Sequence, residues 1–290
     1  MTQRFDTAAI IGVGLLGSSL GLALKARGLV GAVRGVGHRQ VSLDTALGVG
    51  AIDTAYLNAG EAVDGADLIV ICTPANLVCS VLDEIRPVCS AEAVITDVAS
   101  TKVDVCAHAR ATWPTPSRFV GSHPMAGSEK FGPEHGYPEL YEGCVTMVEL
   151  GEHLDAEAQR TVANLWRSVG ATVVEMEPAQ HDTIVARTSH IPHVVAAALA
   201  ALATQNGAVS LDKIRPLVGP GFRDVTRIAG SRPEIWRDIC LTNQAPIVAG
   251  LGEFLAQMHA IRDAIAQGRA EAIEAFFQQG RDARQKTVEP

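Results

Sequence analysis

The sequence lacks the marks of a disulfide-rich, membrane-spanning or nucleic-acid-binding protein. Its six cysteines are scattered and form no Cys-x-x-Cys pair, a pattern typical of reduced thiols rather than of disulfides or a zinc site. Lysine and arginine never form a run, and a formal charge of −8 leaves no basic face for nucleic acid or an anionic membrane. The apolar run at 194–203 is ten residues long, too short to cross a bilayer. We therefore expect a soluble, cytoplasmic protein that acts on small molecules.

The chain has enough apolar material for two domains, since 47% of its 290 residues are hydrophobic. From residue 8 to 176, short β-rich runs alternate with helical stretches, which predicts βαβ units. We expect an α/β Rossmann domain over residues 1–177, with a mainly parallel, doubly wound sheet. The expected strands are Ala8–Gly12, Val33–Gly37, Asp67–Cys72, Ala93–Asp97, Phe119–Gly121, Val145–Leu150 and Thr172–Met176. The expected helices include Ser18–Arg27, Asn76–Arg86, Thr101–Ala111 and Ala156–Val169.

Residues 178–290 contain no further strand pattern and predict an all-helical domain. Its first helix is expected at Ala179–Gln205 with a kink at Pro192. A second helix is expected to start at Ser231, which can cap it while Glu234 bonds back to the cap. Helical patterning continues through Met258 and again over 269–284. The apolar faces of these helices need a partner surface, so we expect a homodimer formed through this domain.

A glycine-rich turn, Gly12-Val13-Gly14-Leu15-Leu16-Gly17, follows the first expected strand and opens the first expected helix. Gly12 suits a tight turn, Gly14 lets a pyrophosphate approach the backbone, and Gly17 lets helix and strand pack closely. The free N–H groups of the helix start, at Leu15 and Leu16, favour an anion. The turn therefore predicts a dinucleotide site.

The end of the second expected strand bears on the choice of dinucleotide. An acidic residue there would bind the ribose hydroxyls of NAD, but the sequence has His38, Arg39 and Gln40. A guanidinium without a carboxylate favours the extra phosphate of NADP, so we expect NADP, with NAD or dual use as the alternative. Thr73 and Pro74, at another strand end, are candidates to line the cofactor.

Two further strand ends carry polar clusters, 97–102 and 121–129. His123, held between a strand and a proline turn, is suited to be a general base near a nicotinamide. In the helical part, His190 and His193 lie three residues apart on one helical face. A metal site would need further ligands, but only His181 is available upstream and no carboxylate–histidine set accompanies it, so no metal site is predicted. The glycine-rich stretch 219–227 places arginines where a substrate carboxylate could be bound.

Taken in order, these motifs resemble the prephenate/arogenate dehydrogenase family of tyrosine biosynthesis, over nearly the whole chain. The residues that carry the resemblance are Gly12–Gly17, Ser100 with Lys102, His123–Glu129, Ser189–His193, Gly221–Ala229 and Pro233–Arg237. The resemblance implies a Rossmann domain, a helical dimerisation domain and an active site between them. It implies oxidative decarboxylation of prephenate to 4-hydroxyphenylpyruvate, or of arogenate to tyrosine.

The resemblance also assigns roles to residues. His123 would take the proton of the ring hydroxyl while hydride leaves for the nicotinamide, and Ser100 would support that hydroxyl and the cofactor. Arg227 would bind a substrate carboxylate. Apart from the resemblance, two substrate carboxylates need local cations in a chain with a net charge of −8, which makes Lys102 a secondary candidate. The remaining substrate-binding candidates, which would gate or line the pocket, are Ser128, Glu129, His193 and Trp236.

Several alternatives stay open at this point. The enzyme could prefer prephenate, prefer arogenate, or act on both as a cyclohexadienyl dehydrogenase. A β-hydroxyacid dehydrogenase or imine reductase shares the architecture, but the hydroxyacid class needs a lysine in the interdomain helix, and 179–205 contains none. A cofactor-sensing regulator without turnover is a further alternative, although it gives no reason for His123, Ser100 and Arg227 to occur together.

Overall fold

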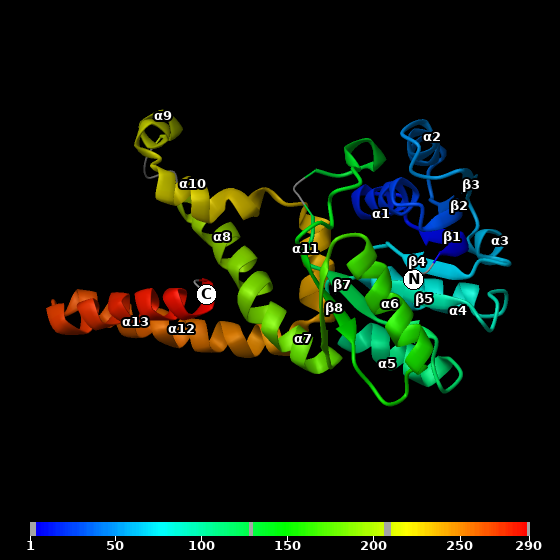
Figure 1. The fold of residues 1–290 in the computed structure, drawn as a ribbon. Helices are drawn as coiled ribbons and strands as arrows, with labels where there is room; N and C mark the ends of the chain where they lie inside the picture. Colours follow the sequence, from blue (N-terminus) through cyan, green and yellow to red (C-terminus); the bar gives the residue numbers. More distant parts are fainter. Residues whose placement is uncertain (1–3, 128–129, 206–209, 289–290) are drawn as a thin grey trace. The chain divides into compact units, whose positions relative to one another are not determined.

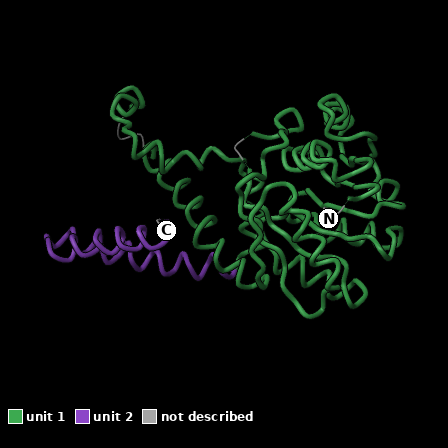
Figure 2. Tube along the Cα trace, viewed as in Figure 1, with its two compact units in different colours: residues 1–244 green, residues 245–290 purple. Residues whose placement is uncertain are grey.

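The computed structural model describes residues 4–127, 130–205 and 210–288. Contacts divide the chain into two compact units, residues 1–244 and residues 245–290 (Figure 2). Every candidate site residue belongs to the first unit. The predicted domain boundary at 177/178 falls inside this unit, between its last strand and its first long helix, and stays a prediction.

A six-stranded parallel sheet forms the centre of the first unit, in the order β3-β2-β1-β4-β5-β6 (Figure 1). The chain order of strands reverses between β1 and β4, which is the arrangement of a doubly wound dinucleotide-binding fold and confirms the predicted class. The strands are β1 Phe5–Ile11, β2 Val30–Val36, β3 Thr54–Tyr56, β4 Leu68–Ile71, β5 Val94–Asp97 and β6 Phe119–Val120.

Helices cover both faces of this sheet because its strands are apolar on both sides. Ile10 of β1 is buried in one hydrophobic cluster, and Ile11 is buried in the other. The first cluster includes α1 Leu15–Ala26, α2 Gln40–Gly48 and α6 Ala156–Ser168. The second includes α3 Ala59–Val63, α4 Val78–Ile85, which follows the 3-10 turn η1 Ala75–Leu77, and α5 Val103–Thr112.

Two of the predicted strands belong to a separate sheet. β8 Val145–Glu149 pairs in parallel with β9 Thr172–Met176 and antiparallel with β7 Ser122–Pro124, a strand that sequence patterning did not predict. Only Gly121 separates β6 from β7. Its N–H is bonded by a side chain, Glu149 Oε2 at 3.0 Å, rather than by a neighbouring strand, which ends the first sheet at that point. The 3-10 turn η2 Pro133–His135 lies between β7 and β8.

The long helix predicted after Pro178 is interrupted. It consists of α7 Pro178–Val185, a π-helical segment Ala186–His190 and α8 Ile191–Leu202. The π-helical segment ends two residues before Pro192, which has no N–H to complete an ordinary α-helical turn. The expected kink at Pro192 is thus a local change of helix type.

The remaining elements of the described chain are helical. The predicted cap at Ser231 is wrong: Arg232 is the N-cap, and the Ser231 hydroxyl instead donates to the Ile228 carbonyl at 2.9 Å, which closes the preceding turn. The elements are α9 Leu211–Ile214, η5 Arg215–Leu217, α10 Pro220–Thr226, η6 Arg227–Gly230 and α11 Pro233–Thr242 in the first unit. The second unit consists of α12 Gln244–Ala266 and α13 Ala270–Val288, joined at Gly268 in a left-handed conformation.

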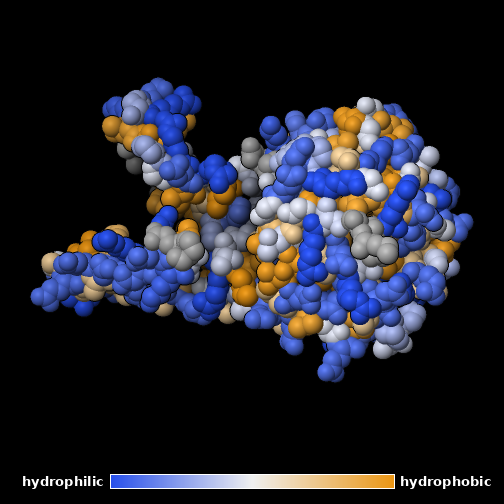
Figure 3. Space-filling model, viewed as in Figure 1, coloured by the Kyte–Doolittle hydropathy of each residue, from blue (hydrophilic) through white to orange (hydrophobic). Residues whose placement is uncertain are grey.

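Exposed apolar side chains gather on α8, α9 and the turns after it (Figure 3). Leu202 is 64% exposed and Leu217 is 85% exposed. The helix over 178–202 has 25 residues and contains an 18-residue window with a mean hydropathy of 1.2, so by length and composition alone it could cross a membrane. It is longer than the apolar run considered in the sequence because it includes polar residues, and one such helix is weak evidence for a membrane span.

Candidate active site

The glycine turn between β1 and α1 has the shape that a dinucleotide requires. Gly12 is in the left-handed region with φ +105°, and a Cβ there would lie 2.5 Å from the Cys72 carbonyl oxygen. A Cβ at Gly17 would overlap the Gly12 carbonyl oxygen, whereas a Cβ at Gly14 would meet nothing within 4 Å. The N-cap of α1, Gly14, has no side-chain cap, so the first N–H groups of the helix remain available. The turn therefore fits a pyrophosphate group.

A buried tyrosine holds this turn from behind. Tyr141 Oη donates to the Leu16 carbonyl at 2.7 Å, and burial raises the pKa of this phenol well above 10.0. The Tyr137 N–H donates to Ser19 Oγ at 3.1 Å from the same segment. Nothing in the sequence near Tyr141 indicated this function, because the two partners are 125 residues apart.

Other predicted cofactor residues lie at the same edge of the sheet. Thr73 lies two residues after the end of β4, and its Oγ1 is buried without a partner among the described residues. Such an orphaned hydroxyl is suited to bind a cofactor. Pro74 is exposed beside it, and His38, Arg39 and Gln40 are exposed between β2 and α2. Gln40 bonds to Asp44, while the described structure gives the Arg39 side chain no ion pair.

His123 is the second residue of β7 and is only 9% exposed. Its Nδ1 lies 2.9 Å from His181 Nε2, and His181 Nδ1 lies 2.7 Å from Asp182 Oδ1. Burial lowers the pKa of His123 well below 6.5, and the nearby His181, Lys102 and His190 lower it further. His123 is therefore neutral at physiological pH, the form in which an imidazole accepts a proton.

Lys102 forms a buried ion pair. Its side chain is completely buried and its ammonium pairs with Asp97, whose other oxygen accepts from the Ser122 N–H at 3.1 Å. The ion pair joins the end of β5 to the residue before α5 and gives the buried lysine the partner that it needs, while the hydrogen bond from Ser122 joins β5 to β7. The role of Lys102 as a secondary cation for a substrate carboxylate stays a prediction. Ser100, in the loop between the two partners of this pair, is half-buried.

The helical part of the unit contributes an aromatic cluster. The His193 and Trp236 rings are stacked with centroids 3.6 Å apart, and the His190 ring lies 6.1 Å from the Trp236 ring. Both imidazoles thus meet one side of α11, as the shared helical face predicted. Burial lowers the pKa of His193, and the charge of Arg227 lowers it further. Arg227 itself is exposed, with its guanidinium close enough to act on His193.

Comparison with known proteins identifies the family of the chain. The family model for the prephenate dehydrogenase nucleotide-binding domain matches residues 20–175, and the model for the prephenate dehydrogenase dimerization domain matches residues 177–279. The chain belongs to the prephenate dehydrogenase family. It is a dehydrogenase with a nucleotide-binding Rossmann part and a helical part.

Relatives of this dehydrogenase cover nearly all of the chain. The prephenate dehydrogenase of Bacillus subtilis is 34% identical over 285 residues, 98% of this chain and 76% of its own length. The cyclohexadienyl dehydrogenase of Zymomonas mobilis is 31% identical and covers 97% of this chain and 95% of its own length. The structure of prephenate dehydrogenase from A. aeolicus, in complex with hydroxyphenyl propionate and NAD+, matches with a TM-score of 0.89, 27% identity and 99% coverage of each chain.

Sequence reasoning missed several residues of the dehydrogenase's site. Asp182 was not singled out, and His181 was considered only as a metal ligand. Asn243, which donates to the Asp182 carbonyl at 2.8 Å, gave no signal either. Conversely, the predicted residues Ser128 and Glu129 lie outside the residues that the structure describes.

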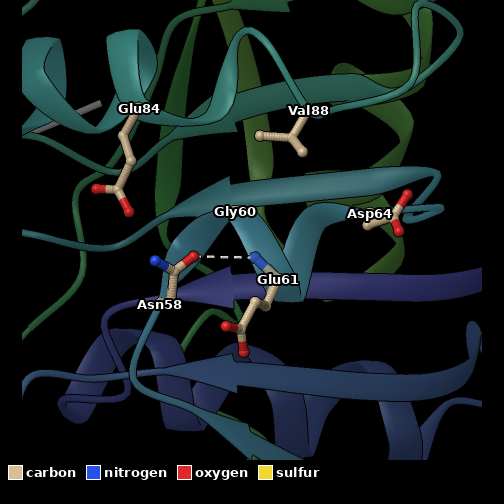
Figure 4. Close-up of a pocket in the computed structure, with 6 residues that line it drawn as sticks. All are labelled: Asn58, Gly60, Glu61, Asp64, Glu84 and Val88. Carbon is tan, nitrogen blue, oxygen red and sulfur yellow. Dashed lines mark hydrogen bonds between the residues drawn. The ribbon is translucent and has the colours of Figure 1, made fainter.

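Two surface hollows contain none of the predicted residues. One has a volume of about 450 Å³ between α3 and α4, with the carboxylates of Glu61, Asp64 and Glu84 around it (Figure 4). The other, of about 1000 Å³, is lined by α5 and by the residues before α6 and at the start of α7. Neither hollow includes the glycine turn or His123, so neither is the candidate active site.

Proposed function

We propose that this enzyme catalyses the NAD(P)-dependent oxidative decarboxylation of prephenate to 4-hydroxyphenylpyruvate, with His123 as the base. The observation that carries the proposal is a buried, neutral imidazole in the same compact unit as a glycine turn that fits a pyrophosphate. The alternatives of the same reaction class are arogenate, giving tyrosine, or both substrates.

The chemistry asks for one proton acceptor and one hydride acceptor. When bound, the nicotinamide cofactor accepts the hydride from the ring carbon that bears the hydroxyl. His123 takes the hydroxyl proton, which pushes electron density toward that carbon. Loss of carbon dioxide then makes the ring aromatic, which makes the overall step strongly downhill. We propose that Ser100, half-buried in the loop after β5, supports the hydroxyl and the cofactor.

Substrate carboxylates need local cations in a chain with a net charge of −8. Arg227 is the candidate, since its guanidinium is exposed and close to His193. The stacked His193 and Trp236 form the apolar side of the same cluster and are suited to line a pocket for the ring and its side chain. Ser128 and Glu129 keep their proposed roles in substrate binding.

For the cofactor we propose NADP, with NAD or dual use as the alternative. Arg39 is exposed directly after β2 and no carboxylate stands at that strand end. The glycine turn, with Leu15 and Leu16 at the helix start, would hold the pyrophosphate, and Thr73 and Pro74 would line the nicotinamide half. His38 and Gln40 would border the adenosine ribose.

One assay tests both choices: prephenate and arogenate, each with NAD and with NADP, followed by the kcat/KM of dinucleotide reduction. We expect the highest value for prephenate with NADP. No reduction with either ring acid would overturn the proposed function, and a clear preference for NAD would overturn the assignment to Arg39. Turnover of β-hydroxyacids alone would instead favour the hydroxyacid dehydrogenase class.

We propose the localisation, the oligomeric state and the domain boundaries from the family match and from the exposed apolar side chains. We propose a cytoplasmic homodimer that forms through residues 178–290, with 1–177 as the nucleotide-binding domain. The exposed leucines of α8 and η5 and the match of this part to a dimerization domain support the proposal. No nucleic-acid or membrane partner is proposed.

A further inference from the structure

Three side chains form a continuous hydrogen-bonded chain that ends at His123. Asp182 Oδ1 contacts His181 Nδ1, and His181 Nε2 contacts His123 Nδ1, at 2.7 and 2.9 Å. All three side chains are at least nine-tenths buried. His181 and Asp182 come from α7, whereas His123 comes from β7, 58 residues earlier. Among the residues that the structure describes, these contacts leave the Nε2 of His123 without a hydrogen-bond partner.

The direction of the hydrogen bonds follows from the surroundings of Asp182. Its two carboxylate oxygens accept the N–H groups of Lys102 at 2.8 and 3.1 Å and of Val103 at 2.9 Å, at the start of α5. Free N–H groups at a helix start favour an ionised carboxylate, which can only accept. His181 Nδ1 must therefore donate to Asp182, and in a neutral imidazole this leaves His181 Nε2 as an acceptor.

The same reasoning then fixes His123. Because His181 Nε2 accepts, His123 Nδ1 carries the hydrogen, and in the neutral ring His123 Nε2 carries none. We propose that His181 and Asp182 are positioning residues that hold His123 in the tautomer whose Nε2 is a free proton acceptor. This inference rests on the proposed function, in which that atom takes the substrate hydroxyl proton.

A separate contact holds the backbone around His181 and Asp182, which together are called the dyad. Asn243 Nδ2, directly after α11, donates to the Asp182 carbonyl at 2.8 Å and lies 3.1 Å from His190 Nδ1. The Thr101 hydroxyl donates to the Thr242 hydroxyl at 2.9 Å, and this hydrogen bond joins the loop before α5 to the end of α11. The dyad is therefore fixed from α5 and α11, as a positioning pair requires.

The first test reads the tautomer directly and needs no substrate. Nitrogen-15 NMR of the full chain near neutral pH separates a ring nitrogen that carries hydrogen from one that does not, and the His123 signals are identified by their loss in His123→Asn. We expect hydrogen on Nδ1 and a bare Nε2. Hydrogen on Nε2 of His123 in the wild-type protein would overturn the inference, whether or not prephenate is turned over.

The second test uses variants of the dyad. His181→Leu removes the acceptor, so the His123 tautomer is no longer fixed, and kcat should fall by about 10²–10³ with KM within a few-fold. His181→Gln offers an amide oxygen at a similar reach and should recover at least about tenfold of that loss. Asp83→Asn is the matched control, since it removes a histidine–aspartate pair at 2.9 Å on the surface, with His108, and should leave kcat unchanged.

Thermal unfolding of each variant separates positioning from folding. If His181→Leu is folded and keeps both wild-type kcat and the Nδ1–H signature of His123, the inference is wrong. A fall in kcat that only follows the folded fraction, with no change in the tautomer, would also overturn it. Absence of turnover in the wild-type protein would instead count against the proposed function, and the NMR result would still decide the tautomer.

Discussion

At the scale of single residues, the decisive property is the charge state of His123. Burial against β8 disfavours the protonated form of His123, and the positive charge of Lys102 disfavours it further, so its pKa lies well below 6.5. A base with this pKa is ready at neutral pH and needs no metal or carboxylate to deprotonate it first. The acidic limb of kcat/KM should accordingly lie below pH 6.5.

Replacement of the base is the most direct check of its role. His123→Asn keeps a donor that can reach His181 Nε2 but removes the proton acceptor. We expect kcat to fall roughly 10²–10⁴-fold, with KM within a few-fold, as for other positioned bases. Steady-state dinucleotide reduction measures both constants, and turnover near the wild-type rate would remove His123 from the role.

Arg227 should act on binding rather than on turnover. Arg227→Ala leaves a substrate carboxylate without its cation, and we expect KM for prephenate to rise by an amount equivalent to about 2–5 kcal/mol. Arg223→Ala, an exposed arginine on α10, is the matched control and should leave KM unchanged. An unchanged KM in Arg227→Ala would contradict the assignment.

The buried His190 predicts how stability depends on pH. Burial lowers its pKa from 6.5 to about 4 in the folded chain. Between pH 4 and pH 6.5, His190 binds more protons in the unfolded chain than in the folded chain. The contribution of this residue to the free energy of unfolding is therefore fully present above about pH 6.5 and is lost as the pH falls toward 4. Urea unfolding across this range should show the decline, and His190→Gln, which can still contact Asn243, should make it shallower. An equally steep decline in that variant would contradict the assignment to His190.

At the scale of elements, the turn between β1 and α1 carries the cofactor proposal. Its glycines differ in what surrounds them: Gly17 is packed against the Gly12 carbonyl, whereas Gly14 faces open space. The turn is held by Tyr141 from the segment before β8, so the cradle depends on packing as well as on its own sequence.

Because Gly14 and Gly17 have different surroundings, we expect an alanine substitution to affect cofactor binding at Gly14 and stability at Gly17. Gly14→Ala should leave the Tm nearly unchanged and raise the KM for the dinucleotide about tenfold or more, equivalent to at least 1.4 kcal/mol of binding. Gly17→Ala should instead lower the stability by about 1–3 kcal/mol, because its Cβ overlaps the backbone. Thermal unfolding and cofactor titration measure the two effects. Equal effects of both variants on Tm would contradict this assignment.

The elements themselves could be predicted unequally well. Continuous apolar strands such as β1 and β4 were found within a few residues, because their pattern is local. β3 and β7 have only three residues each and were missed, and β8 and β9 were placed in the wrong sheet. Whether a strand joins one sheet or another depends on partners far along the chain, and Gly121 alone does not reveal the change.

At the scale of the whole molecule, the exposed apolar side chains of the helical part are typical of a surface that binds another protein chain. Leu202 and Leu217 are among the exposed large apolar residues of the first unit, on the side of α8 and η5. A second copy of the chain is the partner that the family match supports.

Charge placed on this surface should therefore separate the copies. We expect Leu217→Asp to reduce the sedimentation mass from that of a dimer to that of a monomer. Val41→Asp, at an apolar residue 76% exposed on α2, is the control and should remain dimeric. A dimer that persists in Leu217→Asp would show that this residue lies outside the interface.

The fold class, the glycine cradle and the family could be predicted from the amino-acid sequence, because strand periodicity, turn chemistry and ordered motifs are local properties of the chain. The folded structure was needed to show that Lys102 pairs with Asp97, that Tyr141 supports the cradle, and that His181 and Asp182 form a hydrogen-bonded chain with His123. Those contacts join distant segments or depend on which side chains become buried together, and burial is a property of the folded chain rather than of any short stretch of it.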